Sequence, residues 1–236
     1  MNNDLGTPRV DFDQVADGYD AVHANSIRFS GEETAYFAKY KIDAVADDID
    51  CEKGLINTIL DYGAGIGNSA GHFLERFPEA HVICADVSRE SLRVCKERHG
   101  DNVEARRIIN NRLDYSDSSI DIAFVACVFH HIEKKYHLEV LKEIRRLLRP
   151  GGHLFIFEHN PWNPLTQYAV SQCAFDEDAV LISAPDMSHV TTQAGFLDLR
   201  TNYRIFFPKA LSKLRWLEAQ LKWCPLGAQY SIYARA

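Results

Sequence analysis

Apolar and polar positions alternate in blocks from about Leu55 to the end of the chain. Short runs rich in β-branched residues are each followed by a segment with helical spacing. The runs HVICADV and IDIAFVACV are apolar at consecutive positions, which is typical of strands buried on both faces. Strands that alternate with helices indicate βαβ units. The pattern therefore predicts an α/β fold with a doubly wound, mostly parallel sheet.

Two predicted helices carry clear apolar stripes. Residues 133–149 have apolar side chains at a 3.6-residue spacing, and Pro150 ends this helix. Residues 209–223 show a second stripe, which we expect to pack against the chain's own sheet rather than against a partner. The pattern leaves open whether the protein is a monomer or a homodimer.

Two segments depart from the alternating pattern. Residues 11–47 are helical and amphipathic, which predicts an N-terminal helical cap over residues 1–50 and a core over residues 51–236. The segment at about 160–188 contains three prolines and mixed polarity, so we expect an insertion after the fifth strand. We expect the cap and the insertion to close over a small substrate. Deletion of residues 165–180 should then abolish turnover and leave cofactor binding intact.

Charge and composition narrow the class of protein. The chain has 236 residues and a formal net charge of −7, which argues against a nucleic-acid partner. No apolar stretch approaches the ~20 residues of a membrane span. The first residues lack the basic start of a signal peptide, and the six cysteines form no C-x-x-C pair. These features predict a reduced, cytoplasmic protein without a metal site or a membrane association.

The stretch ILDYGAGIGNSAGHF places a glycine-rich turn between a predicted strand and a predicted helix. Its glycines are Gly63, Gly65 and Gly67, and they let the backbone approach a ligand closely. The dinucleotide fingerprint G-x-G-x-x-G needs a glycine where Asn68 stands. The turn therefore favours a nucleoside cofactor without a diphosphate over a dinucleotide, although a simple tight turn is the alternative.

Asp86 ends the second predicted strand, nineteen residues after Gly67. A carboxylate at this place can accept both hydroxyls of a ribose, whichever nucleoside cofactor is bound. The alternative is an acid at a helix N-terminus. The acid and the strand–turn–helix context together favour the cofactor site.

The turn resembles motif I of the class I S-adenosylmethionine-dependent methyltransferases, small-molecule type. FDQVADGYD resembles their N-terminal signature, SSIDIAFVACVFHHI their fourth strand, and LLRPGGHLFIFEH their fifth. The resemblance extends from about Phe12 to the C-terminus. It implies a seven-stranded sheet whose last strand is antiparallel, and S-adenosyl-L-methionine as the cofactor.

The resemblance also implies cofactor-binding residues. Residues 63–65 would pass beside the methionine part, Val87 would lie next to the adenine, and Tyr19 would fold over the cofactor as a lid or serve only as a core aromatic. Asn110 or Asn111 stands where the family often has an aspartate that reads the adenine amine, and an amide oxygen can accept that bond. The full set is Tyr19, Asp61, Gly63, Ala64, Gly65, Gly67, Asp86, Val87, Asn110, Asn111 and Cys127.

Histidines follow the fourth and fifth predicted strands, where open α/β sheets place their ligands. His130, His131 and His159 are candidate bases for a hydroxyl acceptor, or residues that line the site. Further residues are expected to line the substrate mouth: His23, Asn160, Trp162, Asn163 and His189.

The predicted function is transfer of a methyl group from S-adenosylmethionine to an oxygen or nitrogen atom of a small molecule, in a biosynthetic pathway. Two alternatives stay open. One is a non-catalytic protein that binds S-adenosylmethionine. The other is a nucleotide-dependent oxidoreductase, which Asn68 disfavours.

Overall fold

A computed structural model describes residues 32, 34–49, 54–173 and 179–236. Its described residues form one eight-stranded sheet in the order β4-β3-β2-β1-β5-β6-β8-β7. The strands are β1 (Thr58–Tyr62), β2 (His81–Asp86), β3 (Val103–Ile109), β4 (Arg112–Leu113), β5 (Ile120–Ala126), β6 (Leu148–His159), β7 (Leu197–Arg204) and β8 (Gln229–Arg235).

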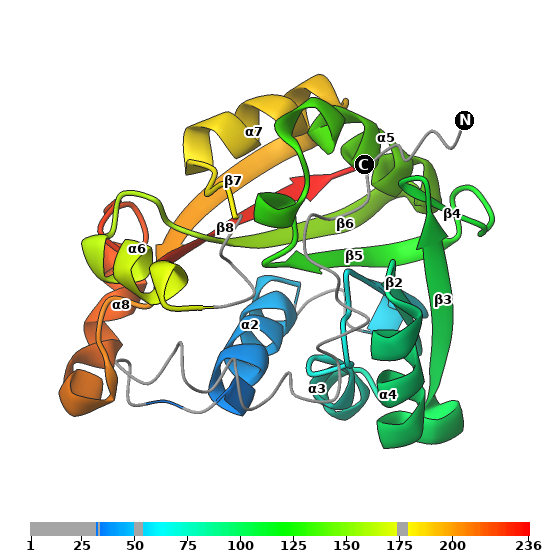
Figure 1. The fold of residues 1–236 in the computed structure, drawn as a ribbon, viewed down its shortest axis with the longest axis horizontal. Helices are drawn as coiled ribbons and strands as arrows, with labels where there is room; N and C mark the ends of the chain where they lie inside the picture. Colours follow the sequence, from blue (N-terminus) through cyan, green and yellow to red (C-terminus); the bar gives the residue numbers. More distant parts are fainter. Residues whose placement is uncertain (1–31, 33, 50–53, 174–178) are drawn as a thin grey trace.

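Helices cover both faces of the sheet (Figure 1). On one face lie α2 (Thr34–Asp48), α3 (Ala70–Arg76) and α4 (Arg89–His99). On the other lie α5 (His137–Leu147) and α7 (Ala184–Gln193). Each face has its own buried apolar cluster, because the strands between them project apolar side chains both ways. The prediction of a doubly wound α/β fold is confirmed.

The central strands β2, β1, β5 and β6 are parallel neighbours, and β8 runs antiparallel to both β6 and β7. The antiparallel last strand is as expected. The carboxyl ends of the parallel strands therefore meet at one edge, where the start of β8 joins them through the pair His159 and Gln229. This edge holds the residues that follow each strand.

The number of strands was predicted wrongly, as seven. The additional strand is β4, which pairs antiparallel with β3. Asn110 and Asn111 form the turn between them, with φ of 50° and 60°. A two-residue hairpin turn of type I′ has positive φ at both positions, and asparagine tolerates it well. A two-residue strand is too short to show as an alternating pattern in the sequence.

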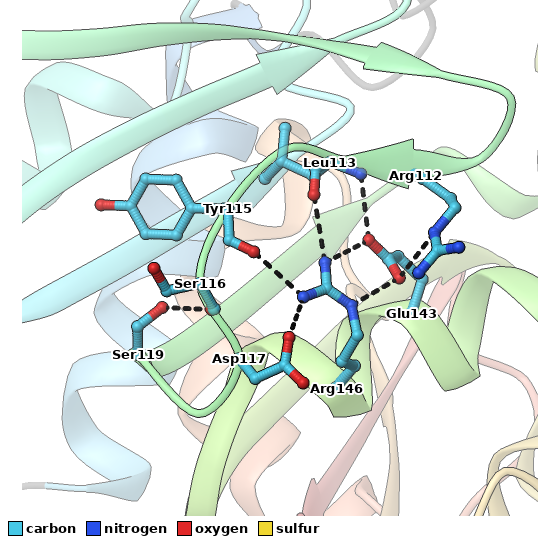
Figure 2. Close-up of polar contacts among 8 residues, drawn as sticks. All are labelled: Arg112, Leu113, Tyr115, Ser116, Asp117, Ser119, Glu143 and Arg146. Atoms are coloured by element: carbon cyan, nitrogen blue, oxygen red, sulfur yellow. Dashed lines mark hydrogen bonds and ion pairs between the residues drawn. The ribbon is translucent and has the colours of Figure 1, made fainter.

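Helix α5 holds this hairpin against the sheet (Figure 2). The carboxylate of Glu143 accepts a hydrogen bond from the Leu113 N–H at 3.0 Å. The guanidinium of Arg146 donates to the carbonyls of Leu113 and Tyr115 at 3.1 and 3.0 Å. Arg146 also pairs with Glu143 at 2.6 Å, so the two side chains satisfy each other while they fix the loop.

The helix predicted over residues 133–149 is shorter than expected. A 3₁₀ turn, η7 (Lys134–Tyr136), precedes α5, and Leu148 already begins β6 by pairing with Ile120. The stripe over residues 209–223 was predicted wrongly. That segment is mainly the 3₁₀ helix η9 (Lys209–Leu217), followed by the short α8 (Glu218–Leu221). Leu211 has non-helical backbone angles, which breaks the register of the stripe, and Trp216 is 67% exposed.

The segment after β6 contains α6 (Pro164–Ser171), as the predicted helical pieces implied. Asn163 caps it by accepting from the N–H groups of Leu165 and Thr166. Beyond residues 174–178, which are not described, the Val180 N–H donates to the His130 carbonyl at 3.0 Å. Both ends of this segment therefore contact the carboxyl edge of the sheet, and its role as a lid stays a prediction.

The N-terminal cap is described only from residue 32 onward. Helix α2 buries Ile42, Val45 and Ala46 in the cluster that it shares with α3. Tyr19 and His23 lie outside the described residues, so their expected roles stay predictions.

Candidate active site

The glycine turn follows β1 and is tied to β2. The N–H groups of Gly63 and Ala64 both donate to the Ala85 carbonyl, at 2.8 and 3.0 Å. A Cβ on Gly63 would come within 2.4 Å of Val128 Cγ2, whereas a Cβ on Gly65 would meet no atom within 4 Å. Gly63 is thus required for close packing, while Gly65 faces open space that a ligand can approach.

Gly67 is required by its neighbours on α4. Its φ is +80°, and an added Cβ would lie 2.6 Å from the Cys95 sulfur. We expect Gly67→Ala to lower the free energy of unfolding by about 1–3 kcal/mol through backbone strain and overpacking. Urea denaturation measures this change. Gly71→Ala is the matched control, because its Cβ would meet only ordinary contacts at 3.7 Å. Equal stability of the two variants would contradict the packing role of Gly67.

Asp86 organises the turn from the end of β2. Its Oδ2 accepts from the Gly65 N–H at 2.8 Å and its Oδ1 from the Ser88 N–H at 2.9 Å. An ionised carboxylate can accept about four hydrogen bonds. Asp86 can therefore hold Gly65 in place and still accept from a ribose. Val87 follows at once and is partly buried against the core.

Asp61 carries an orphaned carboxylate oxygen. Its side chain is 3% exposed, and within the described part of the chain Oδ2 has no hydrogen-bond partner. Burial, and then the neighbouring Asp86 carboxylate, raise the pKa of Asp61 to about 7, although the Lys41 ammonium opposes the shift. A buried acceptor without a donor is costly, so this oxygen suits a cationic ligand group.

Lys41 belongs to the same cluster, and our sequence analysis missed it. It lies on α2, is only 8% exposed, and its Nζ donates to Cys127 Sγ at 3.4 Å. The position of Lys41 in the helical pattern could have revealed it. Lys41 stands three residues after Ala38 and four before Val45, which are both buried, on the buried stripe of the helix. A charge on an apolar stripe indicates a buried partner.

The histidines after β5 and β6 gather around Glu158, and His130 is held most firmly. Glu158 Oε1 accepts from the N–H groups of Val128 and Phe129, at 2.9 and 2.7 Å. Its Oε2 lies 2.6 Å from His130 Nδ1. His130 is 2% exposed, so it acts as the partner of a buried carboxylate rather than as an open base.

His131 and His159 are partly exposed beside this pair. Their rings lie 4.1 and 5.3 Å from the His130 ring, measured between centroids. His159 also lies close enough to Cys127 to lower the pKa of its thiol. The structure therefore brings together Cys127 and the three histidines that the sequence predicted as candidate bases.

Other predicted site residues have structural contacts. Asn160 is fully buried, and its Nδ2 donates to the carbonyls of Pro225 and Gly227 at 2.9 and 2.8 Å. Trp162 is 49% exposed and stacks on Tyr203. Asn163 caps α6, and His189 is exposed on α7. Only Trp162 of these presents a large side chain that a substrate could reach at the carboxyl edge.

Asn110 and Asn111 lie in the β3–β4 turn, the former exposed and the latter 8% exposed. A cavity of 360 Å³ flanks the same hairpin, and none of the predicted site residues lines it. Its lining residues are Arg107, Ile109, Arg112, Leu113, Asp114, Tyr115 and Arg146.

In the described residues, no helix has the length and apolar character that crossing a membrane requires. The same part of the chain holds no group of three or more His, Cys, Asp or Glu side chains arranged to bind a metal ion.

Comparisons with known proteins find methyltransferases. Residues 59–152 match the model of the methyltransferase domain. The chain is 29% identical over 125 residues to the ubiquinone/menaquinone biosynthesis C-methyltransferase UbiE of Hahella chejuensis, which covers 50% of this chain and 49% of that protein. It is 28% identical over 170 residues to the O-methyltransferase cnsE of Penicillium expansum, covering 65% and 60%. The chain thus spans about half to three fifths of the length of these relatives.

Solved structures share the fold. A S-adenosylmethionine-dependent methyltransferase from Thermotoga maritima superposes with a TM-score of 0.65 at 15% identity, covering 95% of this chain and 97% of that one. A sarcosine dimethylglycine methyltransferase from Galdieria sulphuraria, assigned as such only provisionally, gives a TM-score of 0.60 at 17% identity and covers 82% and 84%. At these identities the likeness concerns the fold.

Proposed function

We propose that the chain is a class I S-adenosylmethionine-dependent methyltransferase, on the ground of the methyltransferase domain matched at residues 59–152, and that it transfers a methyl group to an oxygen or nitrogen atom of a small-molecule acceptor. The observation that carries the proposal is the cluster at the carboxyl edge. There an open glycine turn, a ribose-type acid and an orphaned carboxylate adjoin a set of histidines.

The residues present fit S-adenosylmethionine. Gly65 leaves space for close approach, and Asp86 offers acceptors to a ribose. The unpartnered Oδ2 of Asp61 suits the ammonium of an amino-acid tail, and the Lys41 ammonium suits its carboxylate. Asn68 stands where the dinucleotide fingerprint needs its third glycine, so the set fits this cofactor better than a dinucleotide.

When bound, S-adenosylmethionine supplies a methyl group that is already activated on a sulfonium. The protein then has to orient the acceptor and exclude water. Orientation alone can lower the activation barrier by several kcal/mol, and by at most ~7–11 kcal/mol for ideally placed reactants. Helix α2 covers one side of the edge with Lys41, and the flanks of the 160–188 segment cover another.

A partly exposed imidazole favours a hydroxyl acceptor. A hydroxyl must lose its proton as the methyl group arrives, and histidine titrates near neutral pH. His159 is the candidate base because it lies beside Cys127 and is not locked by a carboxylate as His130 is. The name of the Penicillium expansum relative, an O-methyltransferase, is consistent with this acceptor.

A biosynthetic role is part of the same proposal. The Hahella chejuensis relative is named for ubiquinone and menaquinone biosynthesis and for methylation of carbon. Because it matches only half of this chain, it supports the broad role and leaves the acceptor to be identified by screening.

Release of S-adenosylhomocysteine in a screen of phenolic, hydroxy and amine acceptors tests the function. We expect His159→Asn to lower kcat for a hydroxyl acceptor about 10²-fold, the lower end of general-base effects. Its affinity for S-adenosylhomocysteine should stay unchanged. His81→Asn is the control. His81 begins β2, at the end of the strand away from Asp86 and the candidate site, so this variant should keep full turnover.

Two results would redirect the assignment. Cofactor binding without release against any acceptor would support the non-catalytic alternative. If calorimetry detected binding of a nicotinamide dinucleotide and no binding of S-adenosylhomocysteine, the result would support the oxidoreductase alternative.

A further inference from the structure

Cys127 occupies a strained position at the end of β5. Its φ is +59°, a left-handed conformation that costs a residue other than glycine about 1–3 kcal/mol. The surroundings keep it there, because its N–H donates to the Phe157 carbonyl at 2.8 Å. This conformation places the thiol in the cluster that adjoins the glycine turn rather than in the core.

Polar groups from three elements face the thiol. Lys41 on α2 lies 3.4 Å from Sγ, and Gln229 Nε2 on β8 lies 4.0 Å from it. His159 lies near the sulfur and lowers the pKa of the thiol, while Glu158 and Tyr230 are the neighbouring acidic or phenolic groups. Lys41 and Gln229 both direct a hydrogen-bond donor at the sulfur, so this arrangement stabilises a negative sulfur.

Neighbouring charges affect the pKa of Cys127 more than burial does. Burial opposes ionisation of the thiol, but Lys41 and then His159 lower the pKa of Cys127 to about 6. Access also distinguishes it, because Cys84, Cys95 and Cys173 are buried whereas Cys127 is partly exposed. The unpartnered Oδ2 of Asp61, which shares Lys41 as its charged neighbour, is independent evidence that a ligand enters here.

We propose that Cys127 is a nucleophilic thiolate that small soft electrophiles modify, and that its modification closes the amino-acid end of the cofactor site. The sulfur forms the new bond to the electrophilic carbon, and the leaving group departs with the electron pair of the broken bond. No proton moves, because the sulfur reacts in its deprotonated form. The second clause of the proposal rests on the proposed function, and the first does not.

Alkylation of the complete protein by iodoacetamide tests the first clause. The rate at Cys127 is followed by peptide mass spectrometry between pH 5 and pH 9, with Cys224, also partly exposed, as an internal reference. We expect the rate to rise with a midpoint near pH 6. An ordinary thiol has its midpoint near 8.5.

Lys41→Met should move this midpoint up by at least about one pH unit, because the nearest positive charge is lost. Lys41→Arg should keep it low. A wild-type midpoint above pH 8 would overturn the proposal, and so would a Lys41→Met profile identical to the wild type. Should Lys41→Met fail to fold, the wild-type profile and Lys41→Arg still decide.

S-adenosylhomocysteine tests the second clause. We expect S-adenosylhomocysteine at 100 times its Kd to slow alkylation of Cys127 at least about tenfold, because about 1% of the sites are then unoccupied. The alkylated protein should in turn lose its affinity for it. Binding without protection would overturn the second clause. A midpoint near pH 6 without any binding of S-adenosylhomocysteine would support the thiolate and refute the proposed function. Binding of S-adenosylhomocysteine together with a midpoint above pH 8 would support the proposed function and refute the thiolate.

Discussion

Replacing Asp86 with alanine is expected to lower the affinity for S-adenosylhomocysteine about 10³-fold. Two hydrogen bonds from a ribose to a carboxylate contribute about 4 kcal/mol together, which corresponds to this factor. The same change frees the Gly65 N–H that Asp86 holds at 2.8 Å, so the turn loses its shape as well. Isothermal titration calorimetry measures the affinity directly.

The matched control for this variant is Asp101→Ala, since Asp101 is fully exposed on the surface after α4. It should bind as tightly as the wild type. Asp86→Asn should fall between the two, because an amide oxygen accepts hydrogen bonds without the charge. If Asp86→Ala stayed within threefold of the wild type, the carboxylate would have no role in binding and the cofactor assignment would fail with it.

Glu158→Ala is expected to destabilise the fold by about 3–5 kcal/mol, the cost of removing one partner of a buried ion pair. The variant removes the carboxylate beside His130 and the acceptor of the N–H groups of Val128 and Phe129. Those residues follow Cys127 directly, so the loop that carries the site should loosen before the rest of the fold. Urea denaturation at pH 7 measures the loss.

The controls for this second prediction separate geometry from charge. Glu158→Gln keeps the shape and an acceptor oxygen, so it should lose less than Glu158→Ala. Glu97→Ala removes an exposed ion pair with Arg93 and should leave the stability almost unchanged. A Glu158→Ala variant as stable as Glu97→Ala would show that the buried pair contributes nothing net.

The stability that Glu158 contributes should depend on pH with a defined sign. Burial opposes its ionisation, but His130 and its hydrogen bond outweigh burial and keep the pKa of Glu158 below its usual value. A carboxyl whose pKa is depressed by folding contributes stability above its unfolded value of about 4.3, and loses it as the pH falls through the folded value. The gap between wild type and Glu158→Gln should therefore be full at pH 7 and shrink below about pH 4.

The sequence by itself determined the α/β class, the glycine turn and the acid at the end of β2, since each is a local pattern. Consecutive apolar residues indicate a strand buried on both faces, and three closely spaced glycines indicate a bare backbone, whatever the rest of the chain does. The sequence did not predict the two-residue strand β4 or the broken helix over residues 209–223, because the conformation of both depends on packing against distant segments.

Only the tertiary structure decided which side chains share the site. Lys41 precedes Cys127 by 86 residues, and Glu158 follows His130 by 28, yet each pair is in contact. No spacing rule links positions so far apart, because the sheet order and the docking of α2 set their distances. The same contacts assign His130 to a buried ion pair and leave His159 beside the reactive sulfur, a distinction that three histidines in a sequence do not contain.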